Sequence, residues 1–262
     1  MTELERAFAL DPRNPNLALT MGQVETLLRR YERAEGYIDT AIALAPADIV
    51  GYFHKSLTHL LWKGSVPEAR AILAAAPPTD DPFVALAFYW LDVYERHYDS
   101  ALARLATIHT PWFREADDVY PRALLVGQLR RLRGERPLAK AAFEEARRLL
   151  EREVAAHPRD ARLRSSLGIA YAGLGRREEA VREGRLGVEL APVAADAING
   201  TQRVSYLAQI YSMLGDGAAA SEPVAFLLSH PALVSVSSID LDPIWDPVRN
   251  DPTFRRDVHP GS

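Results

Sequence analysis

The sequence predicts an all-α solenoid built from helix-turn-helix repeats, and three observations support this fold class. Apolar residues recur three and four positions apart along most of the chain, which is the spacing of one helix face. Glycine or proline interrupts these segments at short intervals. An alanine also returns once in each pair of helices, with separations of 35, 32, 38, 41 and 40 residues, at Ala34, Ala69, Ala101, Ala139, Ala180 and Ala220. A period of this length is typical of stacked helical hairpins.

The clearest repeat covers residues 161–192 and contains two amphipathic helices separated by one tight turn. Leu167 and Tyr171 lie on the apolar face of its first helix. Gly168 stands between them, where a glycine costs about 1 kcal/mol relative to alanine unless a second helix must pass close by. Gly175 is expected to end the first helix in the left-handed conformation.

This unit resembles the tetratricopeptide repeat, a helical hairpin of about 34 residues. The residues that carry the resemblance are Leu167, Gly168, Tyr171, Ala180 and Pro192. Gly184 and Gly187 depart from the family pattern, which usually has an alanine or a larger residue at these places. The resemblance implies a right-handed superhelix of about six repeats, with the first helix of each repeat lining a concave surface.

One domain is expected to span residues 1–262, with six repeats between residues 15 and 231. Residues 1–14 match the second helix of a repeat that lacks its first helix, so its apolar face would be exposed. We therefore expect that the chain was cut from something longer or that another body covers this end. The fourth repeat has an unusually long second helix, which is expected to protrude.

Residues 232–262 break the repeat pattern and predict a C-terminal cap and tail. Each of three Asp-Pro steps resembles an N-cap followed by a first-turn proline, at Asp242, Asp246 and Asp251. Trp245 and Phe254 are expected to cover the open end of the last repeat, which a solenoid needs for solubility.

The composition of the chain indicates its cellular compartment and excludes several kinds of site. The 262 residues carry a net charge of -4, which argues against general nucleic-acid binding. The chain has no cysteine, so disulfides and thiolate metal sites are excluded. No apolar run approaches the roughly 18 to 20 residues of a membrane span, and no secretory signal is evident at the N-terminus. We therefore expect a cytoplasmic protein without a membrane partner.

No pattern in the sequence points to an enzyme, a cofactor or a metal. Residues 215–220 read GDGAAA, which matches the letters of a dinucleotide-binding loop, but a helix is expected before them instead of a strand. His54 and His59 are five positions apart and so face different sides of a helix. We expect no catalytic residues, no cofactor and no metal site.

A partner-binding groove is expected on the concave face, because residues three, four and seven apart on the first helices share that side. The candidate groove residues are His54, Thr58, Trp62, Trp90, Tyr94, Gln128, Arg131 and Arg162. Trp, Tyr and Arg dominate binding hot spots, so an aromatic cluster with polar neighbours could anchor a peptide. The same rings could instead fill the spaces between repeats.

We therefore predict a protein-interaction scaffold or regulatory module that binds a protein or peptide in its concave groove. The resemblance extends to bacterial repeat arrays that follow a kinase, an adenylate cyclase or a winged-helix DNA-binding domain. Its carrying residues at the two ends are Leu10, Asp11 and Pro12, and residues 241–247. This resemblance implies a place in bacterial signalling, as part of a larger polypeptide or assembly.

Two other functions remain open at this stage. An aromatic pocket around Trp62, Trp90 and Tyr94 could take a small effector; a closed apolar pocket of about 300 Å³ or more would favour this, whereas an open channel would favour a peptide. Between Arg122 and Arg185 the chain has sixteen Lys and Arg against nine Asp and Glu, and this surplus could attract an anionic polymer. Ordinary intrahelical ion pairs explain the same arginines equally well.

Overall fold

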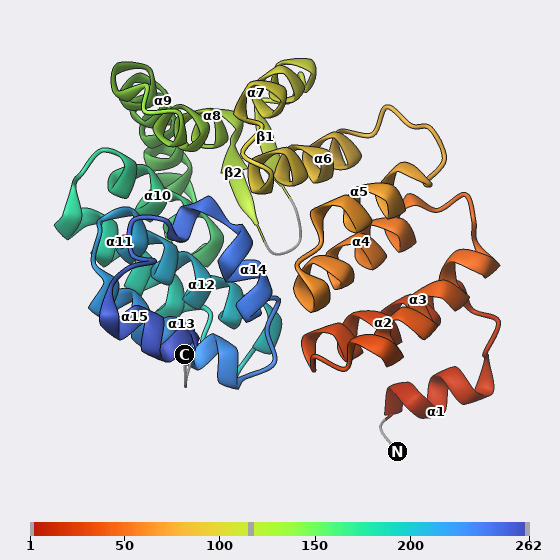
Figure 1. The fold of residues 1–262 in the computed structure, drawn as a ribbon. Helices are drawn as coiled ribbons and strands as arrows, with labels where there is room; N and C mark the ends of the chain where they lie inside the picture. The colour runs from red at the N-terminus through yellow and green to blue at the C-terminus, as the bar shows by residue number, and fades with distance from the viewer. Residues whose placement is uncertain (1–2, 115–117, 260–262) are drawn as a thin grey trace.

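The computed structural model describes residues 3–114 and 118–259, and nearly all of this part is helical (Figure 1). The first helices of the six repeats are α2 (Pro15–Leu27), α4 (Ile49–Lys63), α6 (Pro82–Tyr94), α8 (Arg122–Leu132), α10 (Ala161–Gly173) and α12 (Ala197–Met213). The second helices are α3 (Tyr31–Leu44), α5 (Val66–Ala74), α7 (Tyr98–Thr107), α9 (Arg136–Ala156), α11 (Arg177–Leu190) and α13 (Gly217–Ser229). The predicted all-α repeat solenoid is confirmed.

The helices pack as the repeat pattern predicts. The six recurring alanines are at most 5% exposed, because each lies where the second helix of a repeat meets its neighbours. Gly168 is equally constrained: a Cβ there would lie 2.6 Å from Ile210 Cδ1 and 3.0 Å from the Ala180 carbonyl oxygen. Gly175 adopts a φ of 74°, as expected for the residue that ends α10.

A short β-hairpin follows the third repeat, where the sequence suggests only a linker. Its strands are β1 (Trp112–Arg114) and β2 (Val119–Pro121), which pair antiparallel with Phe113 opposite Tyr120. Ser166 of α10 donates a hydrogen bond from its hydroxyl to the Val119 carbonyl at 2.7 Å. The hairpin therefore joins the third and fifth repeats.

The helix α9 has the predicted length of 21 residues but does not protrude in the expected way. Leu150 and Val154 in its last turns are both buried, and this end of the helix contacts β2 and α10. The hairpin supplies a packing surface that helix periodicity alone cannot predict.

The C-terminal residues form three short elements, α14 (Val236–Leu241), η1 (Pro243–Trp245) and α15 (Pro252–Val258). Asp242 and Asp251 are N-caps, with side chains that accept hydrogen bonds from backbone amides of η1 and α15. The Asp246-Pro247 step begins no helix, contrary to the expectation from sequence. The Asp246 carboxylate instead binds the Arg96 and Arg249 guanidinium groups.

The chain does not end as an open arc. Residues 230–246, which we name the closing segment, cross to the N-terminal repeats, and α14 lies beside α4 (Figure 1). A Cβ at Gly64, in the turn after α4, would lie 3.3 Å from Ser237 Cβ. The concave face is therefore covered by the protein's own C-terminal segment.

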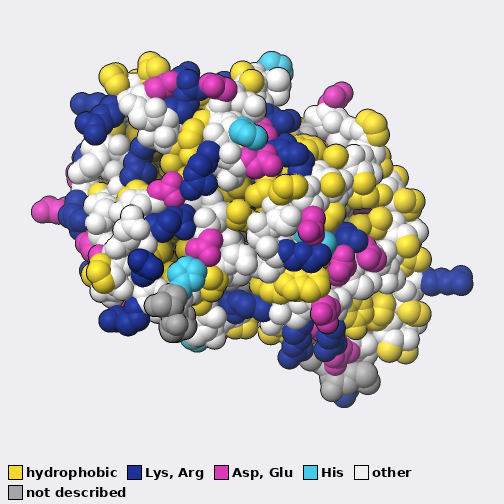
Figure 2. Space-filling model, viewed as in Figure 1, with side chains coloured by type: hydrophobic (Ala, Val, Ile, Leu, Met, Phe, Trp, Pro, Cys, Tyr) yellow, Lys and Arg dark blue, Asp and Glu magenta, His cyan; other side chains and the backbone are white. Residues whose placement is uncertain are grey.

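At the other end, α1 (Glu3–Leu10) is a helix without buried residues, and its Leu10 is 88% exposed. Figure 2 shows hydrophobic side chains at the surface over the N-terminal repeats, on the right of the view. No helix among residues 3–114 and 118–259 is both long and apolar enough to cross a membrane.

Candidate functional site

The inner faces of α4, α6, α8 and α12 surround a cavity of about 290 Å³, which we name the central cavity. The closing segment forms its cover, through Leu233, Val234, Ser238, Ile239, Leu241, Asp242, Ile244 and Trp245. Its volume lies just below the roughly 300 to 1,000 Å³ typical of small-ligand pockets. The closing segment covers this pocket only in part, so it stays partly open to solvent.

Three of the eight predicted groove residues line the central cavity: Trp90, Tyr94 and Gln128. The rings of Trp90 and Tyr94 are stacked, with centroids 6.4 Å apart, because residues four apart share one face of α6. Tyr89 meets Trp90 edge-on at 5.0 Å. These rings form an aromatic wall of the cavity.

The remaining candidates on α4 lie elsewhere. Thr58 is 1% exposed, and its hydroxyl hydrogen-bonds to that of Thr26 on α2 at 2.9 Å. His54 contacts the Gln23 side chain at 2.7 Å, and burial lowers its pKa to about 4, so its imidazole is neutral near pH 7. Both residues face the neighbouring repeat and hold two first helices together.

Trp62, Arg131 and Arg162 also lie outside the lining of the central cavity. Trp62 stacks on Tyr31 with centroids 6.1 Å apart. The Arg131 guanidinium donates to the Met213 carbonyl at 2.8 Å, and Arg162 pairs with Asp160 at 2.9 Å.

Two arginines that hold the closing segment are not predicted from the sequence. In four of the six repeats a glycine with positive φ follows the first helix, at Gly64, Gly134, Gly175 and Gly215. Arg29 and Arg96 take this place in the first and third repeats, with φ of 56° and 59°. The left-handed conformation costs a side-chain-bearing residue about 1 kcal/mol or more. Alignment of the repeat turns would have shown both exceptions.

The Arg29 side chain offsets this backbone cost through contacts with the closing segment and the end of α13. Its guanidinium donates hydrogen bonds to the carbonyl oxygens of Leu227 at 2.6 Å, His230 at 2.9 Å and Val234 at 3.0 Å. Hydrogen bonds from a charged donor each contribute about 1.5 to 3 kcal/mol. The first repeat is thereby fastened to the last.

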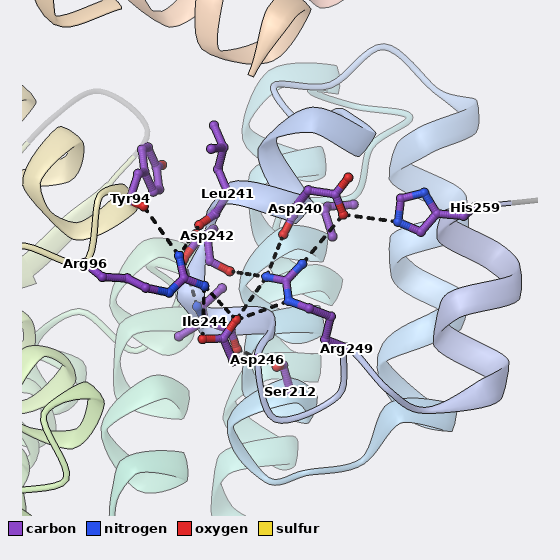
Figure 3. A network of polar contacts seen from close by, with 11 residues as sticks. Tyr94, Arg96, Ser212, Asp240, Leu241, Asp242, Ile244, Asp246, Arg249 and His259 are labelled. Carbon is purple, nitrogen blue, oxygen red and sulfur yellow. Dashed lines mark hydrogen bonds and ion pairs between the residues drawn. The ribbon is translucent and has the colours of Figure 1, made fainter. Parts of the chain in front are cut away.

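Arg96 makes the corresponding contact at the third repeat (Figure 3). Its guanidinium donates to both oxygens of the Asp246 carboxylate, at 3.1 and 3.2 Å, and to the Leu241 carbonyl at 3.4 Å. Arg249 approaches Asp246 from the other side at 3.1 Å. Asp246 therefore lies between two guanidinium groups where α6 meets the closing segment.

Asp242 lines the central cavity beside this network. Its carboxylate accepts a hydrogen bond from the Ile244 amide at 2.9 Å and so caps η1. Burial raises its pKa from 3.8 to about 6, and the Asp246 charge adds to this effect. A carboxylate with a perturbed pKa in a cavity is a feature of functional sites.

The raised pKa of Asp242 predicts a pH-dependent effect of Asp242→Asn on stability. The folded protein holds the proton of the Asp242 carboxyl group more tightly than the unfolded chain does. The free energy of unfolding therefore falls as pH rises from about 4 through about 6. Asparagine can still cap η1 and does not ionise. The variant is expected to gain roughly 1 to 3 kcal/mol over wild type near pH 8 and little near pH 4. Urea unfolding at both pH values measures this; an equal difference at each would contradict it.

The arginine-rich middle of the chain is largely neutralised by neighbouring carboxylates. Eight arginines of this region form ion pairs with Asp or Glu: Arg130, Arg133, Arg147, Arg162, Arg164, Arg176, Arg177 and Arg182. This pairing reduces the positive charge that a polyanion could bind. Within the described ranges, no three His, Asp or Glu side chains are grouped to hold a metal ion.

Comparison with known proteins places the fold in a recognised class. No protein-family model and no curated protein sequence matches this chain. Among solved structures, yeast Tom70 superposes with a TM-score of 0.51 at 16% identity, covering 79% of this chain and 42% of Tom70. The APC/C subunit complex Cut9-Hcn1 gives a TM-score of 0.49 at 14% identity, covering 94% of this chain and 44% of that one. The chain thus spans less than half the length of either.

A tetratricopeptide repeat protein from Parabacteroides merdae also gives a TM-score of 0.49 at 14% identity, with coverage of 94% of this chain and 90% of that chain. The architecture defines the chain as an α-helical repeat solenoid. Its helical hairpins resemble the tetratricopeptide repeat, in agreement with the resemblance of residues 161–192 in the sequence.

Proposed function

We propose that this chain is a protein-interaction module whose concave face binds a segment of a partner protein. One observation carries the proposal: the concave face already holds a polypeptide segment, which is the chain's own closing segment. A face that accepts one peptide through apolar anchors has the shape and chemistry to accept another of similar kind.

The closing segment shows which contacts such a peptide would make. Ile239 is 1% exposed within the main core. Leu241 packs against the apolar cluster that contains Leu60 and Leu91, on the inner helices α4 and α6. A partner segment with two apolar side chains at this spacing would fit the same surface.

Partner binding in this face would compete with the closing segment. Arg29 and Arg96 fasten that segment to the first and third repeats by hydrogen bonds, without entering the central cavity. A partner can bind only those molecules whose closing segment has left the concave face, so its apparent affinity falls as the open fraction falls. Weakening the contacts of Arg29 and Arg96 should raise the open fraction and strengthen partner binding.

Partner capture with matched variants tests this proposal. Arg29→Ala combined with Arg96→Ala should increase recovery of a specific partner over wild type. Adding Trp90→Ala should abolish that recovery, because Trp90 lines the inner face. Arg182→Ala, at a side chain 60% exposed on α11, serves as the surface control and should match wild type. Equal recovery of every bound protein by all four proteins would reject the proposal.

A second candidate function is effector sensing, and the central cavity favours it. A pocket of about 290 Å³ with stacked Trp90 and Tyr94 in its lining suits a small ligand. Trp62, the third ring of the pocket expected from sequence, stacks on Tyr31 outside this lining. We place both functions within a signalling assembly, on the strength of the sequence resemblance to bacterial regulatory arrays.

A further inference from the structure

The charged side chains in the described lining of the central cavity are both acidic. No Lys, Arg or His is among the described residues that line it, and its charged side chains are Asp118 and Asp242. Asp118 already bonds the Arg203 guanidinium at 2.9 Å and the Gln202 amide at 3.2 Å. The carboxylate of Asp242 is the other charged group of the lining.

Asp242 makes no ion pair within the described part of the chain. Arg249 donates a hydrogen bond to the Asp242 backbone carbonyl at 3.1 Å, and Arg96 binds Asp246 (Figure 3). Both guanidinium charges act on the Asp242 carboxylate from a distance and lower its pKa, against the larger effect of burial. Burial raises the pKa of the Tyr89 and Tyr94 hydroxyls, and the negative charge of Asp242 adds to this effect in both. Burial disfavours the ionised form of Asp242, and a positive charge bound beside the carboxylate would favour that form.

The aromatic lining adds a second attraction for positive charge. Trp90, Tyr94 and Tyr89 form one wall, and Phe53, Tyr206 and Trp245 also face the cavity. A cation is attracted to the face of an aromatic ring, and sites for quaternary ammonium groups use this combination of rings. Apolar residues such as Leu60 and Leu125 complete the lining and suit an uncharged body.

We propose that the central cavity binds a small organic cation, an amine or quaternary ammonium group on an apolar or aromatic body, with Asp242 as its counter-ion. This proposal rests on the second candidate function, effector sensing, and gives it a ligand class. An anionic ligand would meet two carboxylates and no basic side chain in the described lining. A neutral ligand would leave the ionised Asp242 without compensation.

Three ligands of nearly equal size but different charge test this class: phenyltrimethylammonium, its neutral isostere tert-butylbenzene, and benzenesulfonate. Binding to the intact chain is measured by calorimetry near pH 8, where Asp242 is ionised. Phenyltrimethylammonium is expected to bind at least about tenfold more tightly than tert-butylbenzene, because its positive charge is attracted both to the Asp242 carboxylate and to the aromatic rings. Benzenesulfonate is expected not to bind.

Two variants assign the effect to Asp242. Asp242→Asn should weaken phenyltrimethylammonium at least about tenfold and change tert-butylbenzene by less than about twofold. Asp240→Asn removes a carboxylate two residues away that pairs with His259 at the surface, and it should leave both affinities unchanged. Should Asp242→Asn fail to fold, Trp90→Leu provides an independent test, with a selective loss of affinity for the cation.

The contrary outcomes are distinct. If tert-butylbenzene binds as tightly as the cation, or if Asp242→Asn leaves cation affinity unchanged, the ligand class is wrong while effector sensing stands. Tight binding of benzenesulfonate would also overturn the class. If none of the three ligands binds, both the ligand class and the effector-sensing function fail, whereas the partner-capture experiment remains independent of this result.

Discussion

Trp245→Ala is expected to lower the free energy of unfolding by about 3 to 5 kcal/mol, because it removes a large buried ring from the C-terminal region. The Trp245 side chain is 4% exposed and stacks on Phe254 with ring centroids 5.8 Å apart. Its neighbour Ile244 is tied to α12, since the Ser212 hydroxyl donates to the Ile244 carbonyl at 2.6 Å. Loss of the ring would open the packing between η1, α12 and α15.

Urea unfolding followed by circular dichroism measures this loss. Trp62→Ala is the matched control, because the Trp62 ring is only partly buried, and its removal should cost clearly less. A Trp245→Ala protein with the wild-type unfolding midpoint would show that these C-terminal residues do not stabilise the end of the last repeat.

Gly168→Val is expected to destabilise the protein by about 2 to 3 kcal/mol through overpacking. A Cβ at this position would lie 2.6 Å from Ile210 Cδ1 and 3.0 Å from the Ala180 carbonyl oxygen. The Ile210 methyl can move, but the backbone of α11 must shift as a whole. The contact between the fifth and sixth repeats would loosen as a result.

Gly36→Ala, at another helical glycine, is expected to stabilise the protein. No heavy atom lies within 4 Å of a Cβ built there, so alanine should stabilise α3 by about 0.4 to 1 kcal/mol. Thermal unfolding of the two variants should therefore shift in opposite directions. A Gly168→Val protein as stable as wild type would mean that α10 and α11 do not pack this closely.

The repeat architecture could be predicted because its signals are local. Each helix shows its buried face within a few turns, and the turn glycines and the buried alanines recur once per repeat, as at Gly175 and Ala180. These signals fix which helices pair and which small residues allow close contact, and the structure confirms both. They do not fix the rotation from one repeat to the next.

Closure of the concave face could not be predicted for that reason. It depends on small rotations summed over six repeats, which bring residues about 200 positions apart into contact, such as Arg29 and Leu227. The acceptors for Arg29 are backbone carbonyls, which leave no pattern in the sequence. The β-hairpin escaped prediction because its two strands have only three residues each.

The candidate site was predicted in part. Trp90 and Tyr94 line the cavity together because residues four apart share one face of α6. Thr58 has the same sequence spacing along α4 but faces α2, where its hydroxyl bonds Thr26. Asp242 was recognised only as a cap, since its place beside the cavity follows from the closure of the solenoid.

The contact between the closing segment and the second repeat can be measured directly, because the chain has no cysteine of its own. A Cβ at Gly64 would lie 3.3 Å from Ser237 Cβ, close to the separation in a disulfide of roughly 3.5 to 4.5 Å. The control pair is Gly36→Cys with Ser237→Cys, since no atom lies within 4 Å of a Cβ at Gly36. Under mild oxidation of the folded protein, Gly64→Cys with Ser237→Cys should form an intramolecular disulfide and the control pair should not. Free thiols in both pairs, or equal cross-linking of both, would contradict a solenoid closed by its own C-terminal segment.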